Sequence, residues 1–146
     1  MSITAAVQIT NLLYRYAECL DRGDLAGAAS LFEYARIKTG DSETDAAGIL
    51  AVWKNVVQIY PCGTPRTQHV VSNPILDIDE AAGKATCRSY YTVFQSPEKL
   101  LLQPIAAGRY HDEFECVDGQ WRFTYRDYSL FDYPGDISRH LKNYVV

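Results

Sequence analysis

Two side chains of this sequence have the chemistry needed for proton transfer, and each lies where apolar and polar residues meet. Asp21 follows an apolar stripe that ends at Leu20, and His69 lies between the polar residues 66–68 and the apolar residues 70–71. A carboxylate bonded to an imidazole fixes the tautomer of the imidazole and favours its charged form, which suits acid–base catalysis near neutral pH. We therefore predict that Asp21 and His69 form a proton-transfer pair.

Each member of this pair also has a purely structural interpretation. An aspartate beside a Gly-Asp turn, here Gly23-Asp24, commonly ends a helix in contact with solvent. A single histidine at the start of a strand commonly makes its hydrogen bonds within the fold. Both interpretations stay open, because neither residue indicates a function without the other.

Tyr16 is the third candidate for a catalytic role. It belongs to the apolar stripe of the first predicted helix, where a buried tyrosine usually bonds a nearby acceptor. Its position relative to Asp21 corresponds to about 140° around an ideal helix, so the two side chains converge only if Asp21 lies in the turn beyond the helix. In that case Tyr16 would polarise the oxygen atom of a substrate.

Further side chains could bind a substrate. Alternation along a strand puts Tyr110 and Asp112 on one face and His111 on the other, so we expect His111 to lie outside any cavity. Arg126 could reach an anionic group. The predicted wall of the cavity is aromatic and consists of Trp53, Tyr91, Phe94 and Tyr110.

The elements that must position these residues are helical in the first part of the chain and extended in the second. Hydrophobic spacing and capping residues predict three helices, at residues 5–20, at 25–32, and from Thr44 or Asp45 to 59. Period-two patterns predict strands at 34–39, 68–78, 85–95, 102–117 and 121–130. Helices followed by an antiparallel sheet indicate the α+β class, with a concave face for a small molecule. Residues 128–146, with a helix-like stretch at 137–144, could form a lid or an interface arm.

Composition restricts the classes of function. The chain has 146 residues, of which 47% are hydrophobic and 22% charged, and its formal net charge is -4. These values predict one globular domain over residues 1–146, and the scattered Lys and Arg residues argue against a nucleic-acid partner. The first residues lack the pattern of a signal peptide and no apolar run is long enough to span a membrane. We therefore expect a cytoplasmic protein with no membrane contact.

Sequence motifs for common cofactors and metals are absent. The four cysteines form no Cys-x-x-Cys pair, the three histidines lack metal-ligand spacing, and neither a phosphate-binding loop nor a Gly-x-Ser-x-Gly motif occurs. We therefore expect no metal and no cofactor.

Several motifs occur in an order that resembles one protein family. They are Tyr16 and Asp21 followed by Arg22-Gly23-Asp24, then Arg66-Thr67-Gln68-His69, then residues 108–114 and 118–123. From about residue 5 to residue 141, the chain resembles the SnoaL-like branch of the nuclear-transport-factor-2-like superfamily. The resemblance implies a cystatin-like α+β cone, in which three N-terminal helices pack in a curved mixed or antiparallel sheet around an internal pocket. It also implies a homodimer formed through the convex face of the sheet.

Near Asp21 and His69, the chain is similar to two kinds of enzyme in this superfamily. The segment Thr67-Gln68-His69 with Asp21 upstream resembles scytalone dehydratase, and the spacing of Tyr16, Asp21 and His69 is similar to that in bile-acid dehydratase. The resemblance implies that the histidine and the aspartate serve proton transfer and water binding. Scytalone dehydratase has a tyrosine, a histidine and an asparagine where this chain has Leu20, Phe94 and Tyr110, so we expect a different substrate.

The residues and the resemblance together predict a cofactor-free dehydratase (a lyase) or isomerase of a cyclic, largely apolar substrate that carries a carbonyl or hydroxyl group. His69 would move the proton, Asp21 would orient His69, and Tyr16 would polarise the substrate oxygen. The alternative is a non-catalytic ligand-binding or scaffold subunit similar to the β subunit of ring-hydroxylating oxygenases. The predicted partners are a small-molecule substrate or ligand and a second copy of the chain.

Overall fold

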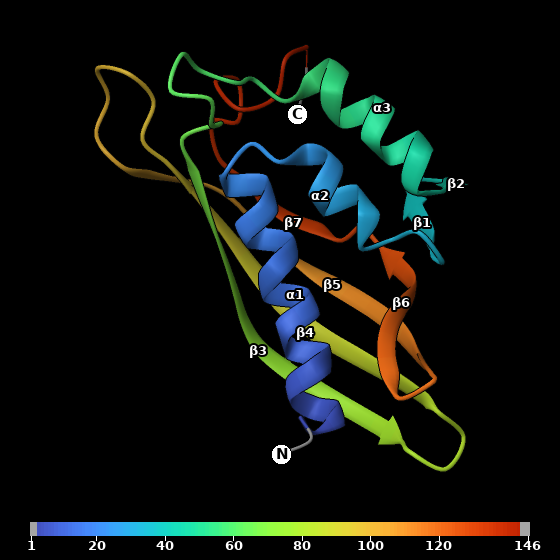
Figure 1. Ribbon diagram of the computed structural model, residues 1–146. Helices are drawn as coiled ribbons and strands as arrows, with labels where there is room; N and C mark the ends of the chain where they lie inside the picture. Colours follow the sequence, from blue (N-terminus) through green and yellow to red (C-terminus); the bar gives the residue numbers. More distant parts are fainter. Residues whose placement is uncertain (1–2, 144–146) are drawn as a thin grey trace.

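Residues 3–143, which the computed structural model describes, form helices gathered over one face of a sheet (Figure 1). The helices are α1 (Ala5–Asp21), α2 (Leu25–Ser30) and α3 (Ala46–Val56). The strands are β1 (Arg36–Thr39), β2 (Ser42–Thr44), β3 (Thr67–Asp79), β4 (Lys84–Gln95), β5 (Gln103–Val117), β6 (Gln120–Asp127) and β7 (Phe131–Pro134). None of the helices in this part of the chain has the length and apolar character needed to cross a membrane.

The strands belong to one mixed sheet in the order β2-β1-β6-β5-β4-β3, with β7 paired to β5 outside this path. β1 runs parallel to β6, whereas β3, β4, β5, β6 and β7 pair in antiparallel fashion. α1 lies along the sheet beside the edge strand β3, and α2 and α3 lie at the end of the molecule that holds β1 and β2 (Figure 1). The structure confirms the predicted α+β cone of three helices in a curved sheet.

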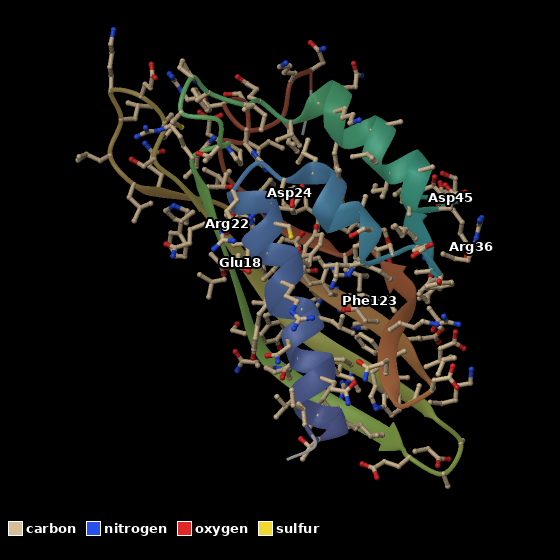
Figure 2. The ribbon with its side chains drawn as sticks, viewed as in Figure 1. Glu18, Arg22, Asp24, Arg36, Asp45 and Phe123 are labelled. Carbon is tan, nitrogen blue, oxygen red and sulfur yellow. The ribbon has the colours of Figure 1, made fainter. Side chains whose placement is uncertain are left out.

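Local sequence explains where the helices lie. The apolar stripe of α1 is buried, and it includes Ile9, Leu13, Tyr16 and Leu20. α2 and α3 each begin at an aspartate, Asp24 or Asp45 (Figure 2), whose carboxylate accepts a backbone N–H from the first turn at 2.8 or 2.9 Å.

Register shifts bend the sheet around the helices. They lie between β3 and β4 at residues 72–75, between β4 and β5 at 93–94, between β5 and β6 at 113–114, and between β5 and β7 at 107–108. An irregularity of this kind bends the strand and increases its twist. Gly108 is needed on β5, because a Cβ at this position would lie 2.5 Å from both the hydroxyl of Tyr91 and the carbonyl oxygen of Leu130. These features produce the concave face that holds the site.

Several predicted boundaries are wrong. The helix predicted at 25–32 ends at Ser30, and the strand predicted at 121–130 ends at Asp127. The third helix was predicted to reach residue 59, but it ends at Val56 because Val57 is extended and forms an antiparallel bridge with Leu141. Residues 131–134 form β7, which sequence alternation does not reveal in so short a segment. The helix predicted at 137–144 is a single turn, in which the N–H groups of His140 and Leu141 donate to the carbonyl of Ile137; Tyr144 lies outside the described residues.

Candidate functional site

A cavity of about 460 Å³ lies between the helices and the concave face of the sheet. Most of its wall is apolar or aromatic, which suits a small molecule of the same character. His69 and His140 lie in this wall together with Tyr91, Tyr110, Tyr128 and Ser129, and these side chains give it a few polar groups.

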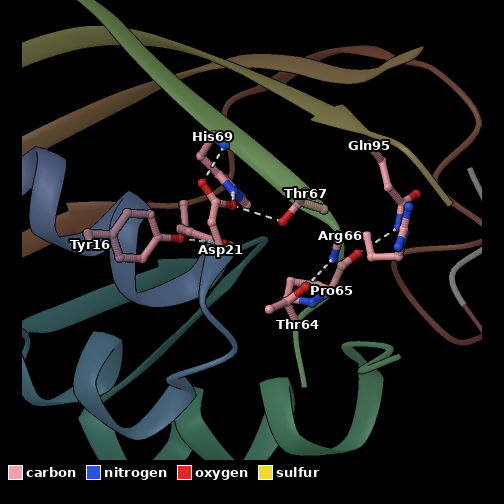
Figure 3. Close-up of polar contacts among 9 residues, drawn as sticks. Tyr16, Asp21, Thr64, Pro65, Arg66, Thr67, His69 and Gln95 are labelled. Atoms are coloured by element: carbon pink, nitrogen blue, oxygen red, sulfur yellow. Dashed lines mark hydrogen bonds and ion pairs between the residues drawn. The ribbon is translucent and has the colours of Figure 1, made fainter. Parts of the chain in front are cut away.

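Asp21 and His69 meet where α1 ends beside β3. Nδ1 of His69 lies 2.6 Å from Oδ1 of Asp21, and the backbone N–H of His69 donates to Oδ2 at 2.7 Å (Figure 3). The hydroxyl of Thr67 donates a third hydrogen bond, to Oδ1 at 2.8 Å. An edge strand such as β3 has N–H groups that no neighbouring strand accepts, and Asp21 satisfies one of them. The structure therefore brings together the two residues that the sequence analysis paired.

The ring of His69 faces the cavity. Residues 67, 69 and 71 of β3 lie on its more buried side, and the His69 side chain is only 5% exposed while that of Asp21 is 19% exposed. Because Asp21 bonds Nδ1, Nε2 is the ring nitrogen left for a ligand. A neutral His69 that donates Nδ1–H to Asp21 carries its lone pair on Nε2 and can accept a proton there.

Tyr16 does not line the cavity, so the prediction that it polarises a substrate oxygen directly is wrong. Asp21 is part of α1 rather than of a turn beyond it, and the two side chains therefore diverge. Tyr16 is fully buried, and its hydroxyl lies 2.8 Å from that of Tyr128, which does line the cavity. Burial raises the pKa of Tyr16 well above its ordinary value, and Tyr110 and Tyr128 raise it further. Tyr16 can therefore affect a ligand only through the wall residues that it contacts, which are Trp53, Tyr110 and Tyr128.

Three of the four predicted aromatic wall residues lie in the wall, namely Trp53, Tyr91 and Tyr110. Tyr91 and Tyr110 are stacked, with ring centroids 4.4 Å apart. The fourth prediction, Phe94, is wrong because Phe94 does not line the cavity. Its neighbour Val93 does, and Phe94 pairs across the ladder with the exposed Gln68, which lies on the convex side of the sheet.

Arg126 does not reach the cavity either, which corrects its predicted role in binding an anionic group. The register of β5 and β6 places it opposite Asp112, and the guanidinium donates two hydrogen bonds to that carboxylate, at 2.7 and 2.9 Å. Four aromatic rings cover the guanidinium, with centroids at 3.8 to 5.2 Å, and they belong to Tyr16, Phe32, Tyr110 and Phe123. Burial lowers the pKa of Arg126, but the Asp112 carboxylate raises it by more, so the guanidinium stays charged.

His140 is the site residue that the sequence analysis missed. Its ring centroid lies 6.1 Å from that of His69, at an interplanar angle of 69°, and both rings line the cavity. Burial lowers the pKa of His140 to about 4, and the nearby His69 lowers it further while Asp21 opposes the shift. His140 is therefore a neutral imidazole at pH 7.

One sequence signal could have found His140. Ile137, His140 and Leu141 are spaced three and four residues apart, so a single helical turn puts them on one face. All three line the cavity. The prediction of a helix-like stretch contained this information, but the side of the molecule on which the stretch would pack depends on contacts that are distant in sequence.

The family of the chain follows from its sequence match over most of its length. A family model described as a SnoaL-like domain matches residues 1–127. The chain belongs to the SnoaL-like domain family. This result confirms the resemblance on which the predicted cone and pocket were based. A search of curated proteins finds no match to this SnoaL-like chain.

Solved structures share its fold at low sequence identity. A Nostoc punctiforme protein of unknown function with a cystatin-like fold is 19% identical, with a TM-score of 0.70 over 94% of this chain and 99% of that protein. A candidate scytalone dehydratase from Novosphingobium aromaticivorans is 22% identical, with a TM-score of 0.63 over 84% and 80% of the two chains. The β subunit of a candidate aromatic-ring-hydroxylating dioxygenase from the same organism is 18% identical, with a TM-score of 0.68 over 88% and 90%. At these identities the comparisons show a cystatin-like fold and leave the function open.

Proposed function

We propose that this SnoaL-like protein is a cofactor-free dehydratase or isomerase of a cyclic, largely apolar substrate with a carbonyl group. The observation that carries the proposal is the Asp21–His69 pair, in which a carboxylate holds Nδ1 at 2.6 Å and the ring faces a largely apolar cavity. Such an arrangement fixes the tautomer of His69 and directs a basic nitrogen at the ligand.

The reaction begins at the carbon next to the substrate carbonyl. Nε2 of His69 takes a proton from this carbon, the C–H electron pair forms a carbon–carbon double bond, and the carbonyl π electrons move to oxygen to give an enolate. In a dehydratase, His69 then returns the proton to a β-hydroxyl group, which leaves as water when the enolate collapses. In an isomerase, His69 returns the proton to a different carbon. The Asp21 carboxylate stabilises the imidazolium that exists between the two steps.

Proton exchange tests this proposal without knowledge of the natural substrate. β-Tetralone is a bicyclic apolar ketone, and the loss of its α-protons in deuterium oxide can be followed by NMR. We expect the wild-type protein to accelerate this exchange and His69→Gln to lower the acceleration by about 10²–10⁴-fold, as for the loss of a general base. His111→Gln is the matched control, because His111 is exposed on β5 outside the cavity and the exchange rate should be unchanged. Full exchange activity in His69→Gln would reject the proposed mechanism.

A non-catalytic subunit is the second candidate function, because the oxygenase β subunit from Novosphingobium aromaticivorans has the same fold with a TM-score of 0.68. In that function, the protein would associate with a larger partner chain. The dehydratase or isomerase proposal instead includes a cytoplasmic homodimer formed through the convex face of the sheet. The mass of the native complex separates the two: twice the chain mass supports the homodimer, and a stoichiometric larger chain supports the subunit.

A further inference from the structure

His140 lies on a short irregular segment, the C-terminal strap (residues 135–142), that hydrogen bonds hold against the fold. The backbone N–H of Gln58 donates to the carbonyl of His140 at 2.8 Å. On the preceding residue, the carbonyl of Arg139 accepts from the hydroxyl of Tyr60 at 2.6 Å and from the amide of Gln95 at 3.0 Å. Ordering a loop costs conformational entropy, and these bonds fix the backbone on both sides of the ring.

Two contacts hold the strap against the sheet. Gln95 is fully buried at the end of β4, and its amide also donates to the carbonyl of Pro65 at 3.1 Å (Figure 3), which links the strap to the start of β3. Gly135 donates its N–H to the carbonyl of Ile105 at 2.8 Å, and a Cβ at this position would lie 2.9 Å from that oxygen. The strap therefore approaches β5 more closely than any residue with a side chain would permit.

The two cavity histidines differ in their partners. Nδ1 of His69 is bonded to Asp21, whereas Nδ1 of His140 is buried and has no hydrogen-bond partner among residues 3–143. Because Nδ1 of His140 is shielded from the cavity, Nε2 is the ring nitrogen of His140 that a ligand can contact. The low pKa of His140, which results mainly from burial, agrees with a neutral ring. A histidine whose Nδ1 is held by a carboxylate and a neutral ring beside it are suited to two different roles.

We infer that His140 is a substrate-binding residue that donates a hydrogen bond from its neutral imidazole to the substrate oxygen while His69 moves the proton at the neighbouring carbon. The inference rests on the proposed function and assigns its oxygen-binding group. The ring centroids are 6.1 Å apart, which lets one substrate lie against both rings. As the proton leaves carbon for His69, negative charge moves to the oxygen, and a hydrogen-bond donor placed there stabilises it.

Histidine NMR tests this inference directly, because the chain has three histidines. A tag-free protein with isotope-labelled histidine gives three imidazoles, which the variants His69→Gln, His111→Gln and His140→Gln assign. The probe is β-naphthol, a stable aromatic analogue of the enol of β-tetralone. We expect the ring-nitrogen signals of His69 and His140 to shift on addition of β-naphthol and the signals of His111 to stay unchanged.

Two substitutions separate the hydrogen bond from the shape of the ring. His140→Phe keeps a planar ring without a donor, and we expect it to bind β-naphthol about three- to tenfold more weakly, the range for one lost hydrogen bond. His140→Gln keeps an N–H donor and should recover most of the affinity. A purely structural role would not produce this rescue.

The outcomes distinguish the inference from the proposed function. Shifts at His69 alone, with unchanged affinity in His140→Phe, would overturn the role of His140, and β-tetralone exchange that depends on His69 would still support the proposed function. Shifts at His140 alone, with exchange unchanged in His69→Gln, would overturn the proposed function and keep His140 as a ligand-binding residue. If the NMR signals of neither His69 nor His140 shift, both the inference and the proposed function are overturned.

Discussion

Two largely buried ion pairs differ in whether one of their side chains faces the cavity. In the Arg126–Asp112 pair, the two oxygens of the carboxylate accept from the guanidinium, and the side chains are 1% and 0% exposed. In the Asp21–His69 pair, the ring of His69 lines the cavity and only one of its two nitrogens is bonded to Asp21.

This contrast gives a physical criterion for separating a structural pair from a functional one. Both pairs have an acid and a base within 2.7 Å of each other, and both are largely buried, so distance and burial alone would treat them alike. The difference is whether an atom that can exchange a proton faces a space that a ligand can enter. By this criterion Arg126 and Asp112 hold the sheet beneath the aromatic rings, and His69 is the residue that we propose to act on a ligand.

The largest effect on stability is expected when the buried Arg126–Asp112 pair is broken. Arg126→Met leaves the Asp112 carboxylate buried without its partner, and we expect a loss of about 3–5 kcal/mol in the free energy of unfolding, measured by urea denaturation. The double variant Asp112→Leu/Arg126→Met should recover much of this loss, because no buried charge remains.

A comparison with Asp21→Asn shows whether the criterion holds. Asp21 is 19% exposed and can be partly rehydrated, so its replacement should cost less than that of Arg126. Equal losses in Asp21→Asn and Arg126→Met would mean that the two pairs hold the fold in the same way, and the contrast between them would fail.

Sequence reasoning succeeded where a residue's role depends on its own segment. The apolar stripe of α1 ends at Leu20, directly before Asp21, and alternation along β5 correctly places His111 outside and Tyr110 inside. Phe94 lies three residues after Tyr91, so alternation along β4 places the two side chains on opposite faces and the two wall predictions were incompatible. For Arg126, position depends on ladder register, which shifts between β5 and β6 at residues 113–114. A register shift changes which side chains face the cavity, and no periodic pattern in a single strand reveals it.

The positions of two other cavity residues could not be predicted from the sequence, for a different reason. His140 and Tyr128 lie outside regular elements, and their positions depend on bonds to residues far away in the chain, such as that between Tyr128 and Tyr16. Irregular segments have no period from which to infer a facing direction. The family resemblance predicted the cone and its pocket, but it could not supply these contacts.

The second prediction concerns how His140 makes the stability of the fold depend on pH. The ordinary pKa of 6.5 applies in the unfolded chain, and burial lowers it to about 4 in the fold. Between these values the unfolded chain binds a proton that the folded chain does not, so stability falls as the pH falls through this window and rises again with pH. We expect His140 to contribute about 2–3 kcal/mol to this fall.

The measurement compares urea unfolding of the wild type and His140→Gln from pH 7 to pH 4. Acidic groups that titrate in the same window, and the neighbours His69 and Asp21, are present in both proteins, so the difference between their curves reports His140. His111→Gln serves as the control and should keep the wild-type curve, because His111 is exposed. Parallel curves for wild type and His140→Gln would show that His140 is not held neutral by burial.

The smallest effect is expected from Thr67→Val, which tests how firmly the Asp21–His69 pair is held. The hydroxyl of Thr67 donates to the same Asp21 oxygen that bonds Nδ1 of His69, and valine removes this bond with little change in shape. We expect a stability loss of about 1 kcal/mol. The backbone N–H of His69 still holds the second oxygen of Asp21, so β-tetralone exchange should fall only a few-fold. Exchange as low as in His69→Gln would mean that Thr67, rather than the backbone, sets the orientation of the carboxylate, and the proton-transfer site would then depend on three side chains instead of two.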